Sequence, residues 1–539
     1  MHRRDFQALG SEQFDILVVG GGIHGLATAY AAAGRGLTVA LVEAGDFGGS
    51  TSFNHQRTAH GGLRSLQTAR FGHARESIAE RRALALMAPR LLRPLPFMVG
   101  TYRSIFKNRL ALRAAFRVDR YLGRKRNDGV EPELHLPVAK LTSRAATLKL
   151  FPGIRQDGLT GGANWYDYQI VHANRLTIAF AEGADARGAR LVNYATAAAP
   201  LKDGTRVAGM RVRDTLTGAE IDVRAKLTIN AAGARAGELM KQFGVSRDLP
   251  LLKALNLVTS KSASDIALAA PSRSGAMLTL TPWHGRALVG TFQSADFRQP
   301  SDLEATLAEV DAAIEDANTA FPALHLTRAD VTLVHRGIVP AEKGAKGAAL
   351  LGSPQIIDHD GAGVAGALTV IGVKYTTARR VGARAAEAAI RRLGRPSLRA
   401  RRRTHEILPG AGIADHEALT IETARAVGLE IAAPIIRHLN AIYGDRSAAI
   451  ARLMAERTDW RMPLVPGRPN VGAEVIHAIR HEMALTLSDF VIRRSELGAM
   501  GHPGDEIIRA AAAIAAEELD WNAERREQEI AAVQAFYGV

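Results

Sequence analysis

A glycine-rich turn between two apolar runs constrains the fold of this chain more than any other feature. Gly20, Gly22 and Gly25 follow the apolar run 16–19 and precede the alanine-rich run 26–33. At this spacing the first glycine permits a tight strand-to-helix turn, the second lets the backbone approach a pyrophosphate, and the third lets helix and strand pack closely. The helix N-terminus adds N–H groups and the positive end of a dipole. The sequence therefore predicts a dinucleotide-binding unit at the start of the chain.

An acidic residue completes this unit. A second apolar run, 37–42, ends in Glu43, 18 residues after Gly25. Folds of this kind place a carboxylate there, where it bonds a ribose hydroxyl of the dinucleotide. We therefore expect the cofactor contacts of the turn to come from Gly20, Gly22, Ile23, His24, Gly25, Glu43 and Ala44.

The composition excludes several kinds of binding site and sets the size of the protein. The 539 residues allow about three to four domain-sized units. The absence of cysteine excludes disulfides, thiolate metal sites and flavin attachment through sulfur, and it is compatible with a reducing cytoplasm. No run of 18 apolar residues occurs, so we expect no membrane-spanning helix. No zinc-type ligand spacing is present either, so the sequence predicts no metal site. No apolar segment or cleavage site of an export signal follows Arg3-Arg4 before the first strand, so we expect a cytoplasmic location.

The charge balance points to anionic partners. A formal net charge of +15 and a pI of about 10.2 suit phosphorylated substrates, lipid headgroups or nucleic acid. The most basic tract, 97–125, carries eight cations and one acid, Asp119, among apolar residues. It is either an internal helix with a solvated charged face or a contact with a membrane surface. No aromatic RNA-recognition motif accompanies it, so we expect no nucleic acid partner.

Three polar loops follow predicted strands. One is the segment 48–64, one is Asn230-Ala231-Ala232-Gly233 after the strand 227–229, and one begins at Gly372 after the apolar run 368–371. Ligands of open α/β sheets bind at the carboxyl ends of the strands, so these loops are expected to meet at the cofactor. Alternating segments between 250 and 345 predict an antiparallel substrate sheet.

Further motifs carry a resemblance to a known family. In order along the chain they are Ala33-Gly34-Arg35-Gly36, Thr51-Ser52, His60-Gly61-Gly62-Leu63-Arg64, Pro282-Trp283, Val289-Gly290-Thr291, Gly372-Val373-Lys374-Tyr375-Thr376-Thr377 and the helical stretch from Glu474 through Glu482 to Arg494. With these motifs, the chain resembles the FAD-dependent glycerol-3-phosphate dehydrogenases from about residue 14 to 535.

The resemblance implies a fold class and domain limits. We expect an α/β protein with a doubly wound, Rossmann-type FAD-binding domain, an antiparallel-sheet substrate domain and an all-helical C-terminal domain. The oxidoreductase region is expected over 14–395, and the helical domain over 404–539. Within the first region, the FAD-binding segments are about 14–88, 166–236 and 355–395, and the substrate-domain segments are about 89–165 and 237–354.

The resemblance also implies an activity. A flavoenzyme of this family oxidises the secondary alcohol of a polyol phosphate by hydride transfer to flavin N5, and its electrons pass to a membrane quinone. FAD is expected to be tightly but non-covalently bound, in a protein that is a homodimer and lies peripherally on the inner face of the cytoplasmic membrane. Further expected FAD contacts are Thr51, Ser52, His60, Gly61, Gly62, Leu63, Ala232, Gly233, Gly372, Lys374, Tyr375 and Thr376.

The substrate-facing motifs depart from the family pattern. Asn256 stands where the family has a histidine, and it cannot accept a proton as a base. Val339 replaces an arginine that anchors the substrate. These changes leave open an alternative substrate, a different hydroxyl or an amine, and they predict that plain glycerol 3-phosphate is a poor substrate. A third possibility, a nucleic-acid-binding protein with a vestigial flavin domain, disagrees with the intact glycine turn and Glu43.

The candidate catalytic residues follow from the same comparison. Lys374 matches a residue beside the flavin and the substrate. Arg57, Arg379 and Arg336 are candidates to hold a phosphate, since arginine binds such groups in a bidentate manner. Arg336, three residues from Val339, either takes over the vacant anchor or pairs with an acid. Asn256 and His60 complete the set, and the candidate proton acceptors are His55, His60, His284 and His335.

Overall fold

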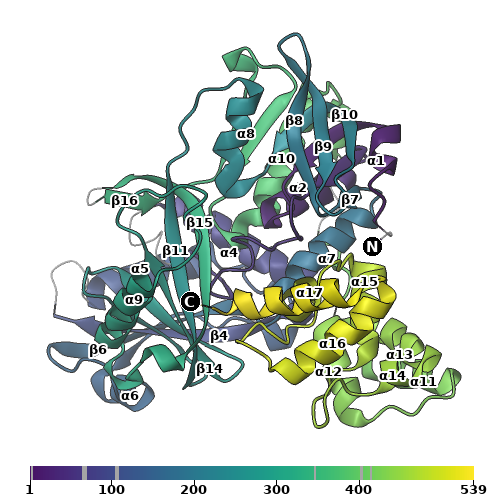
Figure 1. The fold of residues 1–539 in the computed structure, drawn as a ribbon. Helices are drawn as coiled ribbons and strands as arrows, with labels where there is room; N and C mark the ends of the chain where they lie inside the picture. The colour runs from purple at the N-terminus through teal and green to yellow at the C-terminus, as the bar shows by residue number, and fades with distance from the viewer. Residues whose placement is uncertain are drawn as a thin grey trace.

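Two β-sheets form the framework of the chain, and a helical region packs beside them (Figure 1). The computed structural model describes residues 1, 4–62, 70–103, 109–344, 347–400, 405–412 and 416–538. The fold class agrees with the prediction: an α/β dinucleotide-binding unit, a largely antiparallel second sheet and a helical C-terminal region.

The first sheet is built around five parallel strands. In spatial order they are β18 (Ala367–Ile371), β10 (Glu220–Asn230), β1 (Gln13–Val19), β2 (Val39–Val42) and β7 (Arg190–Val192). Their near-continuous apolar runs suit strands that are covered on both faces. Three antiparallel strands extend the sheet: β17 (Gln355–Asp358), β9 (Arg206–Asp214) and β8 (Ala195–Asp203).

Helices cover both faces of this sheet. On one face, α2 (Ile23–Ala33) lies between α10 (Ala378–Arg392) and α7 (Ala173–Asp185). The backbones of α2 and α10 approach so closely that a Cβ on Gly382 would lie 2.4 Å from the carbonyl carbon of Ala27. On the other side, α8 (Ala236–Phe243) packs against β8, β10 and β18. The short α1 (Ala8–Ser11) contacts β10.

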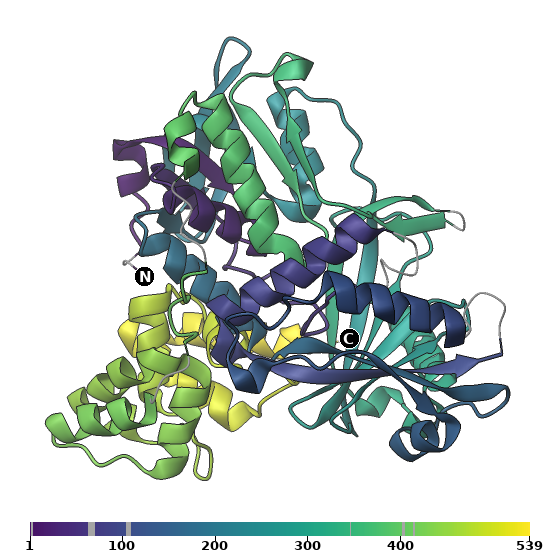
Figure 2. The ribbon, with the colours of Figure 1, turned by 180° about the vertical axis from the view of Figure 1, so that it is seen from behind.

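The second sheet is antiparallel except where β12 and β4 run parallel. Its order is β16 (Gly347–Leu350), β15 (Val331–Gly344), β11 (Leu251–Ser262), β14 (Arg286–Gln293), β13 (Met277–Trp283), β12 (Ala267–Pro271), β4 (Leu92–Tyr102), β6 (Leu159–Ile170) and β3 (Thr58–Ala59), with β5 (Lys140–Ser143) beside β6. The helices α9 (Leu307–Ala320) and α6 (Arg144–Leu150) pack on it, and α4 (Phe71–Met87) lies between the two sheets (Figure 2).

The C-terminal region is helical, as predicted. It contains α11 (His416–Ala426), α12 (Ala433–Tyr443), α13 (Ser447–Glu456), α14 (Thr458–Arg461), α15 (Gly472–Glu482), a π-helix (Asp489–Arg494), α16 (Asp505–Glu518) and α17 (Ala523–Phe536). The helical stretch that begins at Glu474 is interrupted after Glu482, because Met483 takes a left-handed backbone, φ 55°. Asp520, φ 54°, separates α16 from α17, and the side chain of Asn522 caps α17.

The basic tract proves to be part of two different elements. Its first residues complete β4, and α5 (Arg109–Leu122) follows; residues 104–108 lie outside the described part. Phe116 is buried, whereas Arg113, Arg117 and Arg120 are exposed. The Phe116 side chain therefore packs inside the protein and is not available to insert into a lipid surface. The exposed arginines remain available for an electrostatic contact.

A buried ionic cluster joins the first sheet to the C-terminal region. The Asp46 carboxylate, just beyond β2, accepts hydrogen bonds from Arg494 at 2.8 and 2.7 Å and from Arg493 at 2.6 Å. Burial alone would raise the pKa of Asp46, but the two guanidinium groups lower it to about 2. Nearby, Arg175 on α7 forms a bidentate pair with Glu482 at 2.8 and 2.6 Å. These pairs fix the orientation of the helical region.

Replacing Asp46 with Asn is expected to lower the free energy of unfolding by about 3–5 kcal/mol, because two buried cations lose their counter-charge. Since the pKa of Asp46 falls from its usual 3.8 to about 2, its contribution is fully present above pH 4 and is lost as the pH falls toward 2. Urea unfolding at several pH values measures both effects. The exposed pair Asp311–Arg328 supplies the control Asp311→Asn, and equal losses from both variants would contradict the role of Asp46.

Candidate functional site

The glycine turn forms the strand–turn–helix unit that its sequence predicts. Gly20 has φ 110°, and a Cβ there would lie 2.5 Å from the carbonyl oxygen of Ala231. A Cβ on Gly25 would lie 1.8 Å from the carbonyl oxygen of Gly20. Gly22 caps α2 without a side-chain hydrogen bond, so the N-terminus presents backbone groups, and Ile23 N–H donates to Ser52 Oγ at 2.9 Å. Only glycine fits at positions 20 and 25, and the turn suits a pyrophosphate.

Glu43 lies at the end of β2, beside this turn. Its carboxylate accepts hydrogen bonds from the N–H groups of Gly21 at 2.6 Å and Gly45 at 2.9 Å. Desolvation by burial raises the pKa of Glu43. The side chain therefore orders the turn, and Ala44 follows it on the exposed side. This position is compatible with the predicted ribose contact.

The three polar loops meet at the ends of the parallel strands. His60 N–H donates to Thr376 Oγ1 at 3.1 Å, so the loop after β2 contacts the loop after β18. The Tyr375 ring stacks on His55 with centroids 4.3 Å apart. A Cβ on Gly372 would lie 2.3 Å from the His24 ring, which places this segment directly over the start of α2. Burial lowers the pKa of His24 to about 4, so its imidazole is neutral.

The loop after β10 lies on the other side of the candidate site. Ala232 N–H donates to Asn230 Oδ1 at 3.2 Å, and Gly233 has φ 58°, which favours glycine. Thr51 Oγ1 donates to the carbonyl of Ile338 at 3.1 Å and thereby ties the site to β15. Leu63, also expected at the cofactor, lies outside the described residues.

His60 and Gly61 are held by an acid that the sequence analysis missed. The buried carboxylate of Asp167, on β6, accepts from Gly61 N–H at 2.6 Å, pairs with Arg81, and lies 3.3 Å from His60 Nδ1. Burial would raise the pKa of Asp167, but its hydrogen bond with His60 and the charge of Arg81 lower it. A lone acid inside the aromatic run Trp165-Tyr166-Asp167-Tyr168 was the available signal.

Arg57 is the buried cation of the site. Its side chain is fully buried, with the guanidinium carbon 5.0 Å from the Phe53 ring and 4.7 Å from the Trp283 ring. Nη2 lies 3.5 Å from His335 Nε2, while Nε and Nη1 have no hydrogen-bond partner among the described residues. Desolvation lowers the pKa of Arg57 to about 10, so the group stays charged at neutral pH. A buried cation with two unused donors suits an anionic ligand.

Asn256 lies on the same face of the second sheet as this cation. It pairs with His335 across β11 and β15, and its Oδ1 accepts from Thr291 Oγ1 at 2.8 Å. Alternation along β15 places Val339 on the face of His335. Burial and the charge of Arg57 lower the pKa of His335 and His55 well below the usual value, so both imidazoles are neutral.

Two of the predicted arginines are committed to other partners. Arg336 lies on the opposite face of β15 by strand alternation and pairs with Glu304 at 2.9 Å, which favours the alternative in which it pairs with an acid over a role as anchor. Arg379 forms a bidentate pair with the buried Glu80, at 2.9 Å for one bond. Neither guanidinium is therefore aimed at a phosphate. Lys374 caps the short helix Tyr375–Thr377 and lines a small cavity with Glu76.

The described residues fit FAD. The turn leaves room only for backbone at Gly20 and Gly25, as a bound pyrophosphate requires. Above the turn, His24 Nε2 and His55 Nε2 are buried polar atoms with no partner in the described part of the chain. Such atoms in a native site indicate groups that a ligand satisfies.

Comparisons with protein families agree with FAD as the ligand of this site. A family described as FAD dependent oxidoreductase matches residues 15–387, and one described as the C-terminal domain of alpha-glycerophosphate oxidase matches residues 402–526. The first match covers most of the chain, including both sheets, and the second covers the helical region.

Individual relatives extend over nearly the whole chain. A glycerol-3-phosphate dehydrogenase of Mycobacterium leprae is 32% identical and covers 98% of this chain and 89% of that protein. One from Synechocystis is 28% identical and covers 98% and 97%. The X-ray structure of glycerol-3-phosphate dehydrogenase from Bacillus halodurans complexed with FAD shares the fold, with a TM-score of 0.73 at 22% identity over 98% and 95%. The chain therefore belongs to the family of FAD-dependent glycerol-3-phosphate dehydrogenases, and FAD is its cofactor.

Proposed function

We propose that this protein oxidises glycerol 3-phosphate at its secondary alcohol and passes the electrons to a quinone. The observation that carries the proposal is the buried Arg57 guanidinium, whose unused donors lie beside two neutral histidines. The names of the relatives support the same substrate class and favour it over a different hydroxyl or an amine. A phosphate needs a desolvated cation, and hydroxyl oxidation needs a proton acceptor.

Each neighbouring group has a role in this reaction. When bound, FAD accepts the hydride from the carbon that bears the hydroxyl. Arg57 holds the phosphate through Nε and Nη1, and Phe53 and Trp283 exclude water from that ion pair. His335 or His55 takes the hydroxyl proton, since both rings are neutral. Asn256 is too weak a base for this step, and it positions Thr291 instead.

An anaerobic substrate panel tests the proposal. Purified protein with its flavin is mixed with glycerol 3-phosphate, glycerol, other polyol phosphates and amines, and the bleaching of the oxidised flavin band is followed. Bleaching by glycerol 3-phosphate and by none of the unphosphorylated polyols or amines is the expected result, even if it is slow. Bleaching by an amine or by an unphosphorylated polyol, with none by glycerol 3-phosphate, would refute it. A short-chain quinone should then restore the oxidised band faster than oxygen does.

Asn256→His is expected to raise turnover of glycerol 3-phosphate, because a positioned base contributes about 10²–10⁴ in rate. The unmodified protein should accordingly be a slow enzyme on this substrate, as the replacements at Asn256 and Val339 suggest. Steady-state kinetics of the wild type, Asn256→His and Asn256→Ala measure the effect. If the wild type is already fast and the histidine variant is not faster, the histidines nearby suffice as bases and the prediction fails.

We also propose a peripheral position at the inner face of the cytoplasmic membrane. Across the described residues, the helices are all too short or too polar to span a bilayer. The exposed face of α5 carries Arg113, Arg117 and Arg120, with Arg124 beyond it. These cations suit anionic headgroups, at about 1 kcal/mol each near the surface.

Sedimentation with anionic liposomes should therefore be strong at low salt and weak at high salt, because the contact is electrostatic. A variant with Arg113, Arg117 and Arg120 changed to Gln should lose most of this binding while it keeps its flavin. Binding to neutral liposomes of equal strength would contradict the electrostatic contact.

A further inference from the structure

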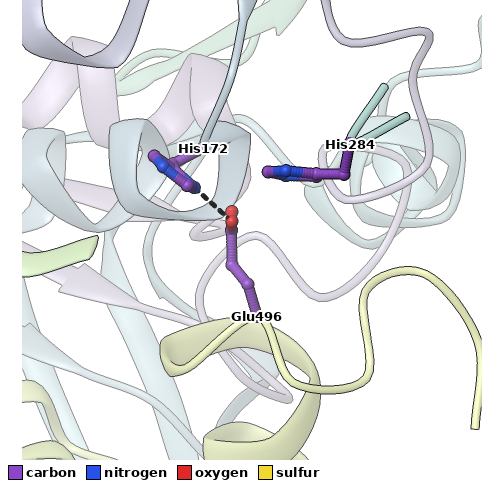
Figure 3. Close-up of side chains that lie close together, drawn as sticks. All are labelled: His172, His284 and Glu496. Atoms are coloured by element: carbon purple, nitrogen blue, oxygen red, sulfur yellow. Dashed lines mark hydrogen bonds and ion pairs between the residues drawn. The ribbon is translucent and has the colours of Figure 1, made fainter. Parts of the chain in front are cut away.

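Three side chains from distant parts of the chain converge beside the flavin region (Figure 3). His172 is the N-cap residue of α7, His284 lies in the turn between β13 and β14, and Glu496 follows the π-helix of the C-terminal region. One possible ligand atom from each lies within 4.8 Å of the others. In the sequence they are 112 and 212 residues apart, so no local spacing could reveal them.

We propose that His172, His284 and Glu496 bind one divalent transition-metal ion of the zinc class. Two imidazole nitrogens and a carboxylate oxygen form a ligand set for such ions, and a fourth position stays open for water. His284 is exposed, whereas His172 is buried, so an ion could enter from the side of the hairpin turn.

The donor atoms need only a small movement to reach coordination distance. Zinc–nitrogen bonds of ~2.0–2.1 Å place tetrahedral donor atoms about 3.4 Å apart. The limit of 4.8 Å therefore exceeds the tetrahedral spacing by at most about 1.4 Å. Figure 3 shows the two rings turned toward the glutamate carboxylate from different elements.

The state of Glu496 supports this assignment. One carboxylate oxygen contacts His172 Nδ1, and the other, Oε1, is buried with no hydrogen-bond partner in the described residues. A buried carboxylate oxygen without a partner is costly unless a cation or donor satisfies it.

Nearby cationic side chains repel a metal ion and set an upper limit on its affinity. Arg57 and Arg90 act electrostatically on Glu496, and Arg57 and Arg93 act on His284. A dication must bind against these charges, so we expect weaker binding than at an isolated site with the same ligands. The alternative is a plain His172–Glu496 ion pair that binds no metal.

Metal titration of the full-length flavoprotein distinguishes these two cases. After dialysis against a chelator, the protein is titrated with CoCl₂ and with ZnCl₂. One Co²⁺ per chain, with the intense visible bands of tetrahedral cobalt beyond the flavin absorption, is expected, together with a rise in melting temperature on addition of Zn²⁺. Failure to bind a stoichiometric ion would overturn the proposal and leave the ion pair.

Two variants and a matched control locate the ion. Glu496→Gln and His284→Asn should each weaken Zn²⁺ binding by at least about 10–100-fold, the loss caused by outer-shell changes alone. Asparagine suits position 284 because His284 has a left-handed backbone, φ 47°. His325, with φ 44°, is exposed in another loop and provides the control His325→Asn. Binding that all three variants retain would place the metal elsewhere and refute this site. The readouts are affinity and melting temperature, so they do not depend on the enzyme's substrate.

Discussion

Gly25→Ala is expected to yield protein without stoichiometric FAD. The added Cβ would lie 1.8 Å from the carbonyl oxygen of Gly20, which is backbone and cannot rotate aside. Helix α2 must therefore move away from β1, and the turn that receives the pyrophosphate opens. Overpacking usually costs ~1–3 kcal/mol, and a clash with backbone exceeds that range. We expect FAD affinity to fall at least about 100-fold, measured as the ratio of flavin to protein absorbance after gel filtration.

Gly237→Ala is the matched control. Gly237 lies in α8, beside the same sheet, where an added Cβ would meet only Leu249 at 3.6 Å, an ordinary contact. This variant should keep its full flavin content, since alanine also favours a helix. Circular dichroism then shows whether Gly25→Ala has lost only its cofactor or its fold as well. A Gly25→Ala protein with full flavin content would refute the close approach of the turn and the helix.

Arg57→Met should nearly abolish the oxidation of glycerol 3-phosphate. The variant removes two charge-assisted hydrogen bonds, each worth about 1.5–3 kcal/mol. The expected loss in kcat/KM is therefore about 10²–10⁴-fold, mostly through KM, because the phosphate is held equally in the bound substrate and the transition state. Arg57→Lys should lose less, since it keeps the charge without the planar fork. Stopped-flow reduction of the flavin measures both variants.

Arg336→Met distinguishes the two interpretations of Arg336, as a phosphate ligand or as the ion-pair partner of Glu304. Arg336 pairs with Glu304 on the far face of β15, so its loss should change kcat/KM little. Flavin content must be equal in all these variants for the comparison to hold. An equally large effect at Arg336 would contradict the assignment of Arg57 as the phosphate ligand.

The sequence predicted those parts of the fold that depend on local patterns. The turn at Gly20–Gly25, the acid at Glu43 and the strand before Gly372 all lie where spacing and apolar runs placed them. Each is encoded by neighbours in the chain, so residue types and periodicity suffice. Family resemblance then supplied the cofactor, which the comparisons confirm.

The direction of charged side chains could not be predicted in the same way. Whether Arg336 faces the site depends on strand alternation and on Glu304, which is distant in sequence. The same holds for Arg379, which meets Glu80 on a different helix. Asp46 and Arg494 are 448 residues apart, so only the assembled fold reveals that they pair. Long-range ion pairs are properties of packing, whereas sequence patterns report local structure.

The position of β18 has a consequence for the synthesis of the protein. β1 ends at Val19, but its sheet is completed only by β18, which ends at Ile371 and pairs with β10. At ~5–20 residues per second, a ribosome needs about 20–70 s to make the intervening segment. Throughout that time the glycine turn has been translated without the loop that covers it. Cofactor capture is therefore a late event in the synthesis of each chain, because the loop after β18 is translated long after the glycine turn.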